Sequence, residues 1–427
     1  MLFLRSVRVV SQKSRYNNKV VDIIIEHGKI AKIGIKLNPS KSHKVISLKG
    51  LCISPGFVDI NSYIGEPGFE QHETVETATL AASKGGITHF CVMPNLHPIT
   101  ASKSTVEFLN QYKIQHPTTL HSIGAISQNL EGKDLADLYD MHNAGAIAFS
   151  DGNTSIPSAG LMERALLYTS NINTLVIQHP EDKSISKNGC MHEGEHSTRL
   201  GLPAIPSISE EIVVSRDLSV LEYTNGKLLF IDISTQKSVS LIANAKKKKL
   251  QVYASCNAYN LLLTDKNVAM YDTNCKVNPP LRDKTDVSSL KKAIKDGIID
   301  CIASQHRAQD EENKKLEFDK ASFGMIGFET FFAVTNTALK DGVDIAQIIS
   351  LISEKPREIL GIHEVKFEEG ADADFVLYDP KAEWTFEETD IYSKSKNSPF
   401  IGFNFTGKVY GTILGNKQIF SPLILSK

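Results

Sequence analysis

The feature that most constrains the fold of this chain is a long alternation of short apolar runs with helical patterns. The apolar runs are rich in β-branched residues and lie at 88–93, 119–123, 146–149, 174–178, 227–233, 250–254 and 298–303. The stretches with helical patterning include 73–84, 209–224, 236–247 and 288–296. Strand–helix alternation over some three hundred residues is typical of a parallel sheet covered by helices. The most economical arrangement is an α/β fold with a closed (β/α)8 TIM-type barrel.

The two ends of the chain have a different pattern, in which short β-rich segments follow one another with only turns between them. At the N-terminal end these segments are 20–26, 29–33 and 45–48, and at the C-terminal end they are 373–378, 408–414 and 417–420. We therefore predict that residues 1–54 and 365–427 form one small β-sandwich domain, and that residues 55–364 form the barrel. The polar, Ser/Lys-rich stretch 383–399 is predicted to be a surface loop.

Composition excludes several classes of protein. The formal net charge is −2 over 427 residues, so no nucleic-acid partner is expected. No apolar stretch reaches the ~18–20 residues that a membrane span needs, so no membrane partner is expected. The six cysteines form no C-x-x-C pair. Free buried thiols in a reducing compartment are the simplest interpretation, and we expect the protein in the cytoplasm.

Polar side chains follow most of the predicted barrel strands at the point where each strand ends. Because the C-terminal ends of barrel strands meet at one face, these side chains are expected to lie close together. They are Asn61, Tyr63, Asn95, Asp151, His179, Asp232 and Gln305.

Residues 55–68 read PGFVDINSYIGEPG and resemble the PGFVD-x-HxHxREPG signature of the dihydroorotase family, type I, in the amidohydrolase superfamily. Other segments resemble the same family in the same order along the chain. They are GEHSTRLGLPAIP at 194–206, KVNPPLR at 276–282, IASQHRAQ at 302–309 (family IATDHAPH) and FGMIGFET at 323–330. The resemblance covers essentially the whole chain and implies the barrel with its terminal β domain.

The resemblance also implies which positions hold zinc and carry out catalysis in the family, and most of these residues are replaced here. Two zinc-binding histidines become Asn61 and Tyr63, and a third becomes Asp232. The catalytic aspartate becomes Gln305, and the arginine that binds the substrate carboxylate becomes Gly65.

Other family positions are retained. Asp151 and His179 match metal-binding residues, although both could equally persist because they hydrogen-bond one another or the loop backbone. The remnants of the substrate pocket are Asn95, Asn278, Phe323 and Gly324.

These replacements bear directly on amide-ring hydrolysis. A bound zinc lowers the pKa of water from ~15.7 to about 7, and a carboxylate then transfers the proton. The side chain of Gln305 does not titrate, and a general base typically contributes ~10²–10⁴-fold in rate. We therefore expect no catalytic residue, no metal site and no cofactor. The alternative is an unusual zinc site formed by Asp151, His179 and Asp232.

Three functions follow from the resemblance. The first is a catalytically inactive dihydroorotase homologue of de novo pyrimidine biosynthesis that forms a homo-oligomer and acts as a structural partner of aspartate carbamoyltransferase. The second is an active dihydroorotase, or a related cyclic amidohydrolase, with an unusual metal site. The third is a small-molecule sensor that binds a pyrimidine-like ligand without converting it.

Overall fold

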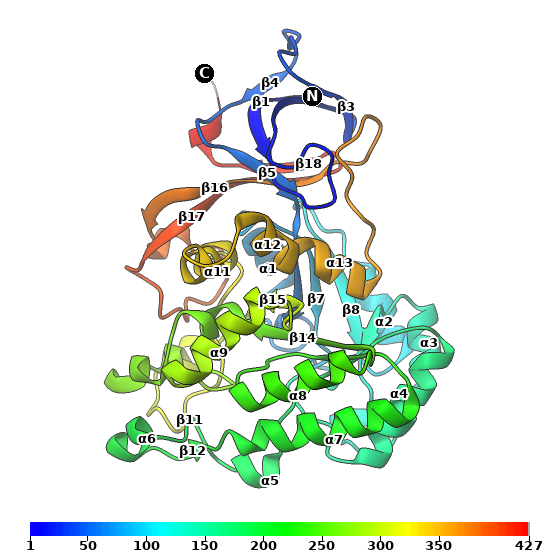
Figure 1. The fold of residues 1–427 in the computed structure, drawn as a ribbon, viewed down its shortest axis with the longest axis vertical. Coiled ribbons are helices and arrows are strands. Elements are labelled where there is room, and N and C mark those ends of the chain that lie inside the picture. The colour runs from blue at the N-terminus through cyan, green and yellow to red at the C-terminus, as the bar shows by residue number, and fades with distance from the viewer. Residues whose placement is uncertain (426–427) are drawn as a thin grey trace.

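The computed structural model describes residues 1–425 and contains the predicted barrel (Figure 1). Eight parallel strands lie in the order β15-β14-β13-β10-β9-β8-β7-β6. Their bounds are β6 Phe57–Ser62, β7 Ile87–Val92, β8 Thr119–Gly124, β9 Ala148–Phe149, β10 Val176–Gln178, β13 Leu228–Phe230, β14 Val252–Asn257 and β15 Cys301–Ala303. A backbone bridge between Tyr63 and Arg307 joins the first and last strands at their C-terminal ends. The (β/α)8 fold predicted from the sequence is confirmed.

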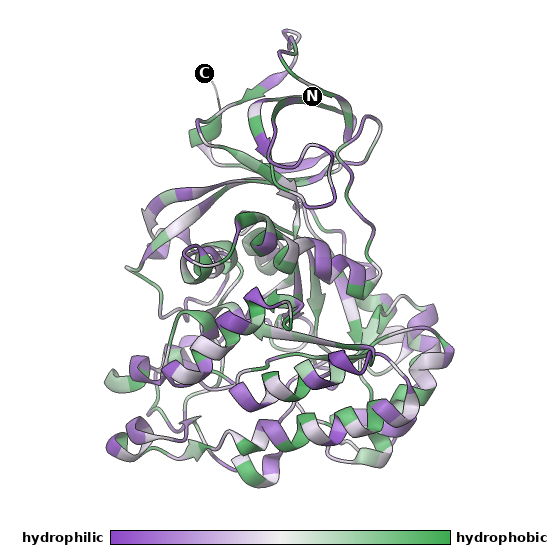
Figure 2. Ribbon diagram, in the orientation of Figure 1, coloured by the Kyte–Doolittle hydropathy of each residue, from purple (hydrophilic) through white to green (hydrophobic). Residues whose placement is uncertain are grey.

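Helices follow the strands and cover the barrel, and Figure 2 shows apolar and polar residues alternating along them. The outer helices are α1 Val75–Lys84, α2 Lys103–Asn110, α3 Leu138–Asn143, α4 Ala159–Asn171, α7 Ile208–Thr224, α8 Gln236–Lys247, α9 Lys284–Lys295, α11 Phe331–Leu339, α12 Ile345–Ile349 and α13 Lys355–Leu360. Shorter elements in the loops are α5 Lys183–Ser186, β11 Met191–His192, α6 Glu195–Leu200, β12 Ala204–Ile205 and α10 Glu311–Lys314.

One helix boundary was predicted wrongly. α9 begins at Lys284, four residues before the predicted start at residue 288. The side chain of Asp283 accepts a hydrogen bond from the backbone N–H of Asp286 and so caps the helix. This Asp cap, which the apolar pattern does not show, sets the start of the helix.

The strands from the two chain ends form a second sheet, drawn in blue and in orange to red at the top of Figure 1. Its strands are β1 Leu2–Val9, β2 Val20–Glu26, β3 Lys29–Gly34, β4 Lys44–Ile46, β5 Cys52–Pro55, β16 Asp374–Thr385, β17 Asn404–Leu414 and β18 Lys417–Phe420. They form one continuous hydrogen-bonded network, in which β5 pairs in parallel with β1 and antiparallel with β16. The two chain ends are therefore joined through β5.

The polar stretch 383–399 is the surface loop that its composition predicted only in part, because exposed and buried residues alternate along it. Its first residues belong to β16, and Ser393, Ser395, Asn397 and Ser398 are buried. The Asn397 amide donates to the backbone oxygens of Arg307 and Gly324, both at 3.1 Å. The segment therefore packs against the loops at the C-terminal face of the barrel, because its side chains satisfy backbone groups there.

Two further predictions concern the cysteines and the membrane. All six cysteines are free and buried, as predicted. Among residues 1–425, no helix combines the length and the apolar character that crossing a bilayer requires.

Candidate functional site

The barrel brings four of the predicted site residues together at the ends of its strands. Asn61 lies in β6, His179 follows β10, and Asp232 and Gln305 lie just beyond β13 and β15. Asp232 and Gln305 have left-handed backbone conformations, with φ of 63° and 47°. Residues other than glycine rarely adopt this conformation, and it clusters at functional sites. The backbone at these two strand ends therefore has the strained form typical of an active site.

The carboxylate of Asp232 lies at the centre of this group, and both of its oxygens have hydrogen-bond partners. Its Oδ1 accepts hydrogen bonds from Asn61 Nδ2 at 2.8 Å and from Gln305 Nε2 at 2.7 Å. Its Oδ2 lies 2.8 Å from Nδ1 of His179. Asp232 is 1% exposed and Asn61 is fully buried. Two substituted residues, Asn61 and Gln305, thus supply amide donors to the carboxylate introduced by a third substitution.

His179 lies between two carboxylates, with Nδ1 facing Asp232 and Nε2 3.4 Å from Oε2 of Glu181. Burial alone would lower the pKa of His179, but its hydrogen bonds to the two carboxylates outweigh burial and raise the pKa to about 9. Burial likewise acts to raise the pKa of Glu181, whereas His179 and Lys183 hold it well below its usual range. At neutral pH the imidazole of His179 therefore carries a positive charge in the metal-free protein.

We expect the ring of His179 to titrate near pH 9 rather than near the ordinary histidine value of about 6.5. Because folding raises this pKa, the stabilisation is complete below pH ~6.5 and is lost as the pH rises toward 9. Ring nitrogen chemical shifts measured by NMR between pH 5 and 10 test this, with His179→Gln identifying the resonance. Titration of that resonance at pH 6–7 would contradict the buried ion pair.

Gln305, which the family resemblance aligns with the catalytic aspartate, is held in place by hydrogen bonds. Its amide nitrogen donates to Asp232 and to the backbone oxygen of Asn278, both at 2.7 Å, and its amide oxygen accepts from the hydroxyl of Tyr259. Gln305 is 7% exposed. All its polar atoms are paired with protein groups, and none of them is able to accept a proton near neutral pH.

Tyr63 and Arg307 occupy the same face of the barrel. The guanidinium carbon of Arg307 lies 5.1 Å from the centre of the Tyr63 ring, a cation–π contact. Burial raises the pKa of the Tyr63 phenol, so the hydroxyl is neutral, and it has no hydrogen-bond partner. Sequence reasoning did not single out Arg307, although it stands where the family segment IATDHAPH has alanine. That exchange was the signal available in the sequence.

Asp151 does not join the His179–Asp232 pair. Its Oδ1 accepts hydrogen bonds from the backbone N–H groups of Ile126 and Ser127, both at 2.9 Å, and its Oδ2 accepts from the Ser127 hydroxyl at 2.5 Å. Of the two interpretations of this retained aspartate, the contacts favour the structural one, in which it holds a loop.

The remnants of the substrate pocket also bond to neighbouring loops. Asn95 donates to the backbone oxygen of Asp151 at 3.3 Å, and Asn278 donates to Oε2 of Glu181 at 2.9 Å. The ring of Phe323 faces the ammonium of Lys276, and the oxygen of Gly324 accepts from Lys314 at 3.0 Å. Each of the four residues thus has a role within the protein itself.

The backbone around Gly65 leaves no room for the family's arginine. A Cβ atom at this position would lie 2.1 Å from the backbone oxygen of Phe69 and 2.5 Å from that of Glu73. Contacts this short do not occur between real atoms, so any side chain at residue 65 requires the loop to move.

The donor set at the barrel mouth does not fit a zinc ion. Asp151, His179 and Asp232 do not bring one atom each within 4.8 Å of one another. Asp232 and His179 are bonded to one another, and Asn61 and Gln305 also donate to Asp232, so these bonds would have to be exchanged before either residue bound zinc. The positive charge that a metal would bring is supplied here by the imidazolium of His179.

The fold is that of the cyclic amidohydrolases. L-hydantoinase from Arthrobacter aurescens matches with a TM-score of 0.86 and 22% identity over 98% of this chain and 96% of its own. D-hydantoinase from Thermus sp. matches with a TM-score of 0.83 and 21% identity over 100% and 96%. The model of the family described as Dihydro-orotase-like matches residues 50–238, and that of the Amidohydrolase family matches residues 231–419.

Curated relatives of higher sequence identity show to which family the chain belongs. A dihydroorotase of Pelotomaculum thermopropionicum is 37% identical over 95% of both chains, and one of Acetivibrio thermocellus is 37% identical over 99% of this chain and 100% of its own. A dihydroorotase of Endomicrobium trichonymphae is 39% identical over 93% and 94%. The chain belongs to the dihydroorotase family.

Proposed function

We propose that this chain is a catalytically inactive dihydroorotase homologue that serves de novo pyrimidine biosynthesis in the cytoplasm as a structural protein. The observation that carries the proposal is the bonding of Asp232, whose carboxylate is occupied by Asn61, His179 and Gln305. A buried carboxylate with three donors is stable without a metal, and the glutamine at position 305 cannot act as a general base.

We propose further that the protein forms a homo-oligomer and associates with aspartate carbamoyltransferase. The family resemblance supports this proposal. The barrel and the terminal sheet of the family are kept, whereas the residues aligned with its metal ligands, its base and its arginine at position 65 are replaced. A scaffold role needs the fold but not the metal site. Sedimentation of the purified protein, alone and mixed with aspartate carbamoyltransferase of the same organism, tests both associations. Independent sedimentation of the two proteins at micromolar concentration contradicts the partnership.

The second candidate function is an active dihydroorotase, which the identity of 37–39% to curated dihydroorotases over nearly the full length favours. This activity would require Asp232 to exchange its hydrogen bonds for a bond to zinc.

Turnover separates the two candidates. We expect dihydroorotate hydrolysis at least ~10⁴-fold below that of an active relative, since both the base and the metal-activated water are missing. A hydrolysis assay with added zinc measures this, with the Acetivibrio thermocellus relative assayed alongside. Turnover that a chelator abolishes, and that zinc restores, would establish the active alternative.

A further inference from the structure

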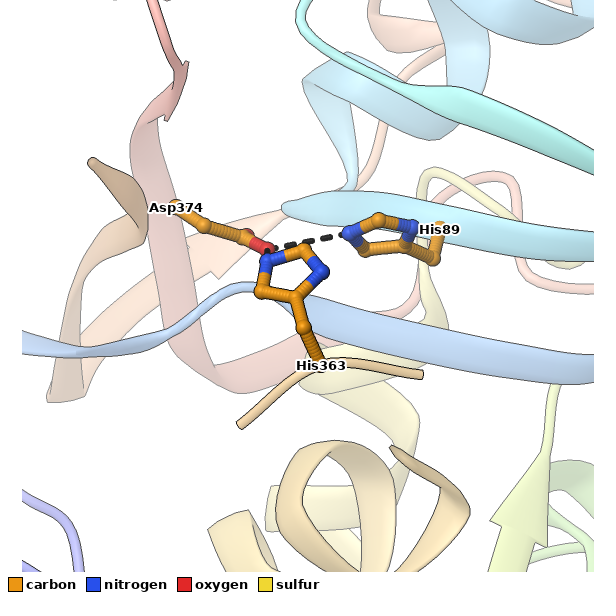
Figure 3. A group of neighbouring side chains, drawn as sticks. All are labelled: His89, His363 and Asp374. Atoms are coloured by element: carbon orange, nitrogen blue, oxygen red, sulfur yellow. Dashed lines mark hydrogen bonds and ion pairs between the residues drawn. The ribbon is translucent and has the colours of Figure 1, made fainter. Parts of the chain in front are cut away.

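A second cluster of polar side chains lies at the opposite end of the barrel, where the barrel meets the terminal sheet (Figure 3). His89 lies near the start of β7, Asp374 is the first residue of β16, and His363 follows α13. The three residues come from separate parts of the chain and point toward one another, as Figure 3 shows. The cluster therefore links the barrel to β16 of the terminal sheet.

The three side chains each bring one ligand-type atom to the same place. Nε2 of His89 lies 2.9 Å, and Nε2 of His363 lies 3.4 Å, from Oδ2 of Asp374. All three atoms lie within 4.8 Å of one another. Zinc binds imidazole nitrogen and carboxylate oxygen at about 2.0–2.2 Å, so two of its ligands in tetrahedral geometry lie roughly 3.3 Å apart. The spacing of the cluster matches that requirement with only small side-chain movements.

The surroundings of these atoms suit a metal site as well. Nδ1 of His89 lies 2.9 Å from Nε2 of His121, a partner that would orient the His89 ring as outer-shell groups orient metal ligands. Arg357 Nη2 lies 2.9 Å from Oδ2 of Asp374 and holds the carboxylate in place. Asp374 is 1% exposed, and its Oδ1 has no hydrogen-bond partner. The oxygen that faces the two imidazoles is the other one, Oδ2, which also contacts Arg357.

The three side chains of the cluster differ in their exposure to solvent. His89 and Asp374 are buried, whereas the side chain of His363 is 56% exposed. A metal ion can therefore reach the site from solvent past His363. The arrangement, two histidines and one carboxylate with a position open to water, is one that zinc uses in proteins.

We propose that His89, His363 and Asp374 form a zinc-binding site at the base of the barrel, separate from the family's metal position at its mouth. The ion would join the barrel to the terminal sheet, because its ligands come from β7, from the segment after α13 and from β16. The nearby guanidinium of Arg357 opposes a second positive charge, so the site favours reversible binding over permanent occupancy.

Zinc titration of the metal-free, untagged protein against a chromophoric chelator tests the proposal. We expect one zinc ion per chain for the wild type. His363→Ala should weaken binding at least tenfold, because loss of even an outer-shell partner commonly costs ~10–100-fold in affinity. His363 is exposed, so its replacement leaves the fold intact. His363→Asp should bind more tightly than His363→Ala, since carboxylate is also a zinc ligand.

The matched control is His196→Ala, which removes a histidine of α6 outside the cluster and should leave zinc affinity unchanged. Cobalt absorption spectra supply a second readout, since visible bands of a tetrahedral cobalt complex should appear in the wild type and be lost in His363→Ala. Equal zinc affinity of the wild type and His363→Ala, or no zinc binding by the wild type, would overturn the proposal. A zinc ion at the barrel mouth would appear as a second equivalent that His363→Ala does not remove, so the two sites are distinguishable.

Discussion

Asp232→Asn is expected to lower the free energy of unfolding by about 3–5 kcal/mol, because it breaks a buried ion pair and leaves His179 with only the more distant carboxylate of Glu181. The carboxylate now accepts from Asn61, Gln305 and His179. An asparagine offers one oxygen acceptor to these three donors and brings an NH2 group that faces a donor. The family resemblance assigns a metal ligand to this position, whereas here Asp232 accepts hydrogen bonds from the residues around it.

Urea denaturation of the two proteins at pH 7 measures this loss. Asp182→Asn is the control, since its side chain caps α5 and asparagine caps a helix as well as aspartate does. A double-mutant cycle with His179→Gln should give a coupling of roughly 0.5–3 kcal/mol, as expected for residues in contact. A loss below 1 kcal/mol for Asp232→Asn would mean that the network contributes little to the fold.

Gly65→Arg, which restores the family's arginine, is expected to destabilise the protein rather than to repair a binding site. Its Cβ would overlap the backbone oxygens of Phe69 and Glu73. Overpacking of this kind typically costs about 1–3 kcal/mol, and more where the obstacle is backbone. Because the clash arises at Cβ, Gly65→Ala should cost nearly as much as Gly65→Arg.

Thermal unfolding of the variants measures this effect. Gly342→Ala is the control, because a Cβ there would meet no atom within 4 Å. If Gly65→Arg were as stable as the wild type and also bound dihydroorotate, the loop would be free to readopt the family conformation. The loss of the arginine could then be reversed by a single substitution.

Much of the fold was predictable because the signal is periodic and repeated. Apolar runs alternating with helical patterns predicted the barrel, and the β-rich ends predicted the second sheet. The errors occur where one side chain decides the outcome. Asp283 sets the start of α9, and Asn397 draws a polar segment inward by bonding backbone oxygens. Composition averages over such residues and does not detect them.

At the site, sequence spacing predicted which residues meet but not how they bond. Asn61, His179, Asp232 and Gln305 were expected together, since strand ends converge. The hydrogen bonds that Asp232 accepts from the other three residues depend on side-chain rotamers and on the left-handed backbone at residues 232 and 305. No residue type in the sequence indicates that backbone conformation. Long-range packing determines the conformation of the loops. The contact between Arg307 and Tyr63 and the crowding at Gly65 both depend on those loop conformations.

The pairing of β5 with β16 has a consequence for how the chain is made on the ribosome. Cys52 and Tyr378 are register partners, with the entire barrel between them in sequence. At translation rates of ~5–20 residues per second, β5 emerges roughly 15–60 s before its neighbour exists. During that interval its unpaired edge can bond to other nascent chains. We therefore expect the chaperone dependence of this protein to fall mainly on its first fifty-five residues, which include β5.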